Sequence, residues 1–171
     1  MKQNKTSFVA FFASTSVIVG ATILAACSAT NPMMRADGTT ETKSGYARSR
    51  TGLDRIREGS TTFKAGNSAP GLDIIRAGVI QFSDGLDMMR SGLGMMSGDM
   101  MGRCGGSPDR VMDGVDKGMA TVREGLKMME DADPNNDADG MGKMDSGMKM
   151  GEDGMKVVDG ATSCMGHGNM M

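Results

Sequence analysis

The chain has 171 residues, a length typical of one domain, and a formal net charge of −2 at pH 7. It contains 26 glycines and 21 methionines, but no tryptophan and a single histidine. We find no acid–base–nucleophile grouping and therefore expect no enzymatic activity. Residues 71–171 carry ten basic and seventeen acidic side chains. An acidic half of this kind argues against a nucleic-acid partner, which requires a basic face.

The first 26 residues have the features of a secretory signal peptide. Lys2 and Lys5 form a short basic region, and an uncharged apolar run extends from Phe8 to Ala26. Small residues then precede a break, as at a cleavage site. A signal peptide of residues 1–26 predicts a protein exported to the cell envelope.

The break itself, Leu24-Ala25-Ala26-Cys27, resembles the lipobox of bacterial lipoproteins. The resemblance implies cleavage before Cys27 and acylation of its thiol and its new α-amino group, as with palmitate. Several acyl chains anchor a protein stably in a membrane. Ser28 follows, which resembles the default signal for the outer membrane, facing the periplasm. The alternative is an ordinary signal peptide with an incidental cysteine.

Residues 27–44 are rich in threonine, serine, asparagine and glycine, and are expected to form a flexible tether. From residue 45 onward, glycine recurs every seven residues over long stretches, and in most repeats it is followed at once by an apolar residue and by another three positions later. Gly71-Leu72, Gly78-Val79 and Gly85-Leu86 begin successive repeats. Alternating spacings of three and four predict helices that pack along a seam.

Interruptions of this repeat divide residues 45–163 into four predicted helices. Asn67-Ser68-Ala69-Pro70 and Ser107-Pro108 carry residues that stop or cap helices. The expected ranges are about 45–66, 70–101, 108–131 and 139–162. Their short connections predict an all-α fold, either a four-helix antiparallel bundle or paired helical hairpins.

Glycine inside a helix costs about 1 kcal/mol relative to alanine, so a row of glycines must be offset by something else. The row predicts a groove in which a neighbouring helix backbone comes close. That neighbour is either another segment of this chain or a helical protein partner, including a second copy.

Eighteen of the 21 methionines fall between residue 88 and the C-terminus. Ten occupy core positions of the repeat: Met89, Met96, Met100, Met112, Met119, Met129, Met141, Met144, Met148 and Met155. Thioether sulfur is a soft ligand that suits Cu(I), and four methionines flank the glycine groove instead: Met88, Met95, Met128 and Met150. The candidate metal ligands are Met88, Met89, Met95, Met96, Met100, Met101, Met128, Met129, Met165 and His167.

Two cysteines remain if Cys27 is acylated. In an up-and-down bundle, Cys104 and Cys164 fall at the same end, and an even pair in an oxidising compartment predicts a disulfide. The alternative is a metal site formed by Cys104, Cys164 and His167. Residues 164–171 form a tail with further potential ligands, including Met170 and Met171.

The acidic segment 131–140 offers a different metal hypothesis. Asn135, Asp137, Asp139 and Gly140 resemble positions 1, 3, 5 and 6 of an EF-hand calcium loop. Ser146 stands where the family has a bidentate glutamate, so only weak calcium binding by a helical hairpin is expected.

Together these patterns predict a lipid-anchored, non-catalytic protein of the cell envelope, at the periplasmic face of the outer membrane. The leading hypothesis is soft-metal binding, with Cu(I) the expected ion. The alternatives are a structural or interaction lipoprotein that binds no metal, and the weak calcium-binding hairpin.

Overall fold

The computed structural model describes residues 32–96, 98–131 and 133–167. The signal peptide, Cys27 and residues 168–171 lie outside this part of the chain. Its helices are α1 (Pro32–Lys64), α2 (Ser68–Met95), α3 (Gly98–Cys104), α4 (Pro108–Glu130) and α5 (Pro134–His167). No strand occurs among the described residues. The predicted all-α class is therefore confirmed.

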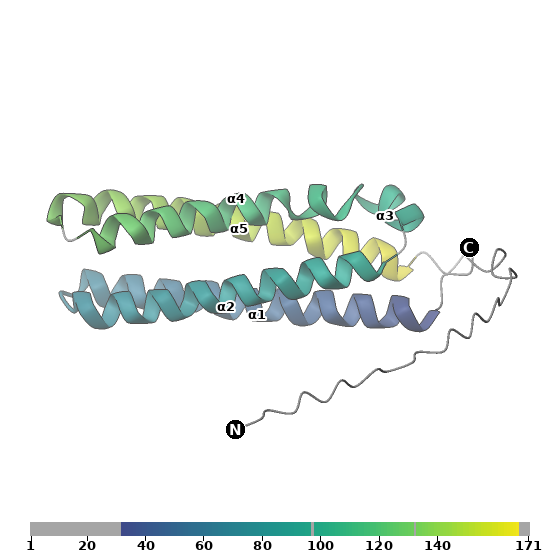
Figure 1. Ribbon diagram of the computed structural model, residues 1–171, viewed down its shortest axis with the longest axis horizontal. Coiled ribbons are helices and arrows are strands. Elements are labelled where there is room, and N and C mark those ends of the chain that lie inside the picture. Colours follow the sequence, from purple (N-terminus) through teal and green to yellow (C-terminus); the bar gives the residue numbers. More distant parts are fainter. Residues whose placement is uncertain (1–31, 97, 132, 168–171) are drawn as a thin grey trace, which may run out of the picture.

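The four long helices form two antiparallel hairpins that lie against each other as two layers (Figure 1). Helix α1 packs along α2, and α4 packs along α5. Between the layers, α2 contacts α4 and α1 contacts α5. The short α3 packs against α5 at the end where α1 begins and α5 finishes. The structure thus has the paired helical hairpins expected from the repeat.

Local sequence determines where several helices stop and start. Gly66 adopts φ +88°, and the amide of Asn67 donates to the carbonyl of Thr62, as in a Schellman motif at the end of α1. Ser107 caps α4 as expected, because its side chain accepts a hydrogen bond from the amide of Arg110 and Pro108 takes the first helical position. These ends fold each helix back onto its neighbour.

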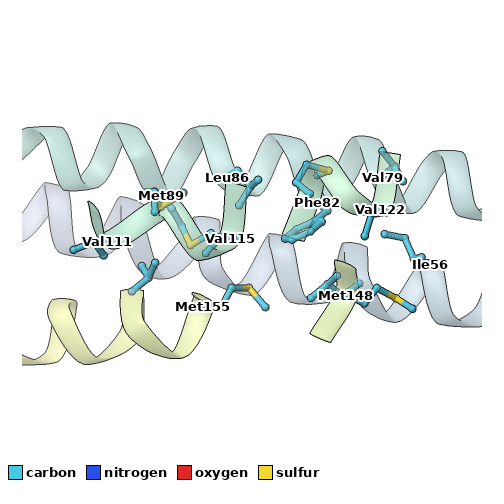
Figure 2. Packing of buried hydrophobic residues seen from close by; sticks show 14 of the residues in the cluster. Ile56, Val79, Phe82, Leu86, Met89, Val111, Val115, Val122, Met148 and Met155 are labelled. Carbon is cyan, nitrogen blue, oxygen red and sulfur yellow. The ribbon is translucent and has the colours of Figure 1, made fainter. Parts of the chain in front are cut away.

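A single buried core runs between the two hairpins. Phe82, Ile56 and Met148 point into it from three different helices (Figure 2). Nine of the ten methionines assigned to core positions are buried; the side chain of the tenth, Met100, lies outside the described residues. Eleven of the 24 hydrophobic core residues are methionine. Unbranched thioether side chains make this core more adaptable than one of leucine and isoleucine.

The glycine rows lie inside each hairpin. Gly52 and Gly78 face each other so closely that a Cβ added to either would lie 2.8 Å from the other's carbonyl oxygen. Gly118 and Gly147 do the same in the second hairpin, at 2.7 Å. Other pairs continue the rows at seven-residue steps: Gly38 with Gly92, Gly45 with Gly85, Gly59 with Gly71, and Gly125 with Gly140. The grooves expected from the sequence are thus filled by the chain's own helices.

Exposed ion pairs join the edges of the two layers. Arg90 pairs with Asp116 at 2.8 Å and Arg76 with Glu130 at 2.7 Å, both between α2 and α4. Between α1 and α5, Arg57 pairs with Glu152 and Lys64 with Asp145. Such pairs contribute little free energy each, so the buried core carries the packing of the layers.

Three predicted boundaries are wrong. The flexible tether expected for residues 27–44 is helical from Pro32 onward, because Gly38 continues the glycine row of α1 and faces Gly92. The single helix expected over 70–101 is interrupted, because Met96 adopts an extended conformation with ψ 144° and α3 begins afresh at Gly98. The last helix begins at Pro134 and not near 139.

Candidate functional site at the disulfide-bonded end of the bundle

A disulfide bond joins Cys104, the last residue of α3, to Cys164 in α5. The two Sγ atoms lie 2.00 Å apart and the Cα atoms 5.6 Å apart, and the two cysteines have a sequence separation of 60. The bond holds α3 across the end of the bundle. Bonded sulfurs are not thiolates, so they do not supply the ligands that the alternative Cys104–Cys164–His167 site requires. The side chain of His167 lies outside the described residues.

Four buried methionines occupy this end, each from a different segment. Met96 directly follows α2, Met101 lies in α3, Met112 is near the start of α4, and Met165 is near the end of α5. Their exposed fractions are 5 %, 2 %, 0 % and 0 %. All four belong to the same continuous cluster of buried side chains. We call these four residues the thioether cluster.

The surroundings of the thioether cluster are mostly apolar, although Thr42 and Thr162 are buried at the same end. Val111 and Ala161 are buried toward the same end, and Met89 and Met155 project into the core (Figure 2). The Thr39 hydroxyl donates a long hydrogen bond, 4.0 Å, to the Met96 sulfur. Soft, uncharged sulfur atoms in an apolar space favour a soft, singly charged ion over hard cations such as Mg²⁺ or Ca²⁺.

The methionine pairs predicted as ligands do not gather in one place. Met128 and Met129 lie at the end of α4 remote from the disulfide, where they straddle the position of Gly140. Met95 and Met96 straddle Gly38 in the same way at the disulfide end. In each pair one side chain is buried, whereas Met95 is 47 % exposed and Met128 is half-buried. The pairs therefore have a packing role along the seam.

Of the other predicted ligands, Met88 is half-buried and Met89 is buried. Met150, which was expected beside the groove but not among the ligands, is 38 % exposed on α5. Met165 was assigned to a tail and is instead fully buried within α5. Met101 lies off the core positions of the repeat, whereas Met165 takes the core position seven residues after Val158 but lies beyond the predicted end of the last helix. The signal that was available is that both lie beside a cysteine expected to close the same end.

The structure does not form the loop on which the calcium interpretation depends. Asp133 accepts a hydrogen bond from the amide of Asn135 at 3.0 Å and so caps α5, whose first turns contain Asp137 and Asp139. Alternate residues on an α-helix point about 200° apart, so these side chains cannot converge on one ion as they do in a loop. No group of three His, Cys, Asp or Glu side chains among the described residues is placed to hold a metal ion.

The charged grooves on the surface are closed by their own ion pairs. The groove between α1 and α5 is lined by Arg57, Lys64, Asp145 and Glu152, which pair with one another across it. The hydrogen bond that Arg57 donates to the Glu152 carboxylate raises the pKa of Arg57 above its ordinary value. A groove whose charges are already satisfied is a poor site for a charged ligand.

Comparison with known proteins adds no assignment. No family model matches the chain, and neither the curated proteins nor the solved structures contain a match. Within the described residues, no helix combines the length and the apolar character that a bilayer crossing requires.

Proposed function

We propose that this chain is a lipid-anchored, non-catalytic protein of the cell envelope that binds Cu(I) through the thioether cluster. The observation that carries the proposal is that four buried methionines from four segments lie toward the disulfide-bonded end and belong to one continuous core. Thioether sulfur prefers Cu(I) and needs no deprotonation, so it stays a ligand in an oxidising compartment where free cysteine does not.

The anchor is part of the same proposal. The lipobox-like sequence ending at Cys27 supports acylation, and Ser28 supports the outer membrane, periplasmic side. A disulfide between Cys104 and Cys164 is consistent with an exported protein. Methionine side chains are flexible enough to rearrange around an ion without unfolding the helices that carry them.

The proposal is tested by exchanging thioether for hydrocarbon at constant volume. In the variant, Met96, Met101, Met112 and Met165 are all changed to leucine. Leucine fills nearly the same space, so the bundle should remain folded. Cu(I) affinity is then measured by competition with a chromophoric Cu(I) chelator under anaerobic conditions. We expect the affinity to fall by at least tenfold.

A matched variant separates this site from methionine content in general. Met129, Met141, Met144 and Met148 are buried toward the opposite end and are changed to leucine as the control. Circular dichroism must show both variants to be helical. Loss of affinity only in the first supports the proposal. Equal affinity in all three proteins would refute it and would leave a structural, metal-independent role.

A further inference from the structure

We propose that the disulfide-bonded end of the bundle lies against the lipid headgroups and that the opposite end, which carries the α1–α2 and α4–α5 turns, projects away from the membrane. The inference rests on the proposed acylation of Cys27 but not on copper binding. Its elements are the length of chain before α1, the end at which α1 begins, and the distribution of charge along the bundle.

The chain between the anchor and the bundle is short. Cys27 and Pro32, the first residue of α1, are separated by five residue steps. Even a fully extended chain spans only about 3.5 Å per residue, so α1 begins within roughly 18 Å of the acylated cysteine. The helical start of α1 at Pro32 therefore removes the long tether that residues 27–44 would have provided.

The start of α1 lies at the same end as α3 and the last turn of α5 (Figure 1). Helix α5 has 34 residues. At 1.5 Å per residue it is about 50 Å long. An anchor within roughly 18 Å of one end thus leaves the other end tens of ångströms from the headgroups, unless the bundle lies flat on the membrane.

The charges along the bundle favour the upright orientation. Residues 130–139, at the far end, contain five acidic side chains and no basic one, whereas residues 96–110, at the disulfide end, contain two of each. An anionic lipid surface repels the acidic far end, whereas it neither attracts nor repels the near end, whose charges cancel. A flat bundle would use the basic side of α1, where Arg48 and Arg57 are paired with Asp84 and Glu152 and Arg55 donates to the uncharged Gln81, so the acidic far end is the stronger argument for the upright orientation.

The absence of tryptophan from the chain gives a clean test. One tryptophan is introduced at Gly102 in α3, where an added Cβ meets nothing within 4 Å, or at exposed Ala65 in the α1–α2 turn. The full-length acylated proteins are reconstituted into phosphatidylethanolamine–phosphatidylglycerol vesicles that contain headgroup-dansylated lipid. Energy transfer from tryptophan to dansyl should be several-fold stronger for Gly102→Trp than for Ala65→Trp.

Met95→Trp, at an exposed position near the end of α2, serves if Gly102→Trp does not fold. Equal transfer from both ends, or stronger transfer from Ala65→Trp, would overturn the orientation while leaving the anchor intact. Flotation of the vesicles in a density gradient tests the anchor separately. The Cys27→Ser protein should remain in the dense bottom fraction and should not float with the vesicles. If the unaltered protein also remains in the bottom fraction, the proposed anchor is refuted, and the proposed orientation is refuted with it.

Discussion

Each glycine in the seam between paired helices is there because the opposite backbone occupies the space of a side chain. A Cβ on Gly52 would lie 2.8 Å from the carbonyl oxygen of Gly78 and 2.8 Å from the Cα of Phe82. Backbone atoms in the middle of a packed helix cannot move aside as a side chain can. The close approach of the helices offsets the conformational cost of placing glycine inside them.

Some helical glycines in this chain face the backbone of the opposite helix, and others face open space. Substitution by alanine should have opposite effects on stability at these two kinds of position. Gly52→Ala should lower the free energy of unfolding by about 1–3 kcal/mol, because the added methyl group forces the hairpin apart. Gly160→Ala should raise it by about 0.5–1 kcal/mol, because a Cβ there meets nothing within 4 Å and alanine is the better helix former. Denaturant unfolding monitored by circular dichroism measures both. Stabilisation by Gly52→Ala would contradict the seam.

Methionine complements glycine at this scale. The Cγ of Met96 lies 3.1 Å from the position of a Gly38 Cβ, and the Cγ of Met129 lies 2.7 Å from that of Gly140. An unbranched side chain is narrow at its base, so it passes beside the opposite glycine where a branched one would be crowded. This packing accounts for methionine along the seams without any metal, and Met96 has this role in addition to its place in the thioether cluster.

At the scale of elements, the short helix α3 depends on its disulfide. It has seven residues, too few for a stable isolated helix, and it ends at Cys104. Its buried residue Met101 and the bond to Cys164 hold it against α5. Losing the bond should therefore release α3 and open the disulfide end.

Replacing both Cys104 and Cys164 by serine should lower the free energy of unfolding by about 4 kcal/mol, the chain-entropy value for a closed loop of about sixty residues. Thermal unfolding with and without reductant measures this effect. Reductant should lower the melting temperature of the unaltered protein toward that of the variant and leave the variant unchanged. A variant as stable as the oxidised protein would show that α3 is held by packing alone.

The sequence allowed the class, the hairpin pairing and several helix ends to be predicted, because a seven-residue spacing specifies both the helix and its buried face. The errors arose where composition was given more weight than spacing. Threonine and serine around residue 40 suggested a tether, although Gly38 continues the row that Gly45 and Gly52 form. Similarly, Asp133-Pro134 is a helix start, but the acidic residues around it suggested a calcium loop.

At the scale of the whole molecule, the candidate site depends on which ends meet, and a repeat in one chain does not contain that information. The repeat predicts most of the core methionines, but Met101 lies off its core positions and Met165 lies beyond the predicted end of the last helix. They became part of a cluster only when α3 folded back across the end of the bundle and α5 continued to His167. The near end thus combines the start of α1, the disulfide and four thioethers.

The opposite ends of the bundle therefore differ in chemistry. One end is close to the proposed anchor and rich in buried sulfur, and the other is acidic and remote from it. The described residues 32–167 contain 17 basic and 21 acidic side chains, so the domain as a whole attracts cations weakly without selecting among them. Selection of one ion must come from ligand softness, which only the methionines supply in this fold.

The most direct test of this account is X-ray absorption spectroscopy at the copper edge on the acylated protein, loaded anaerobically with one equivalent of Cu(I). The account predicts a Cu(I) edge with a first shell made of sulfur only. That sulfur shell should disappear in the protein with leucine at Met96, Met101, Met112 and Met165, and it should persist when leucine replaces Met129, Met141, Met144 and Met148. A first shell of nitrogen or oxygen, or copper that does not stay with the unaltered protein, would contradict it.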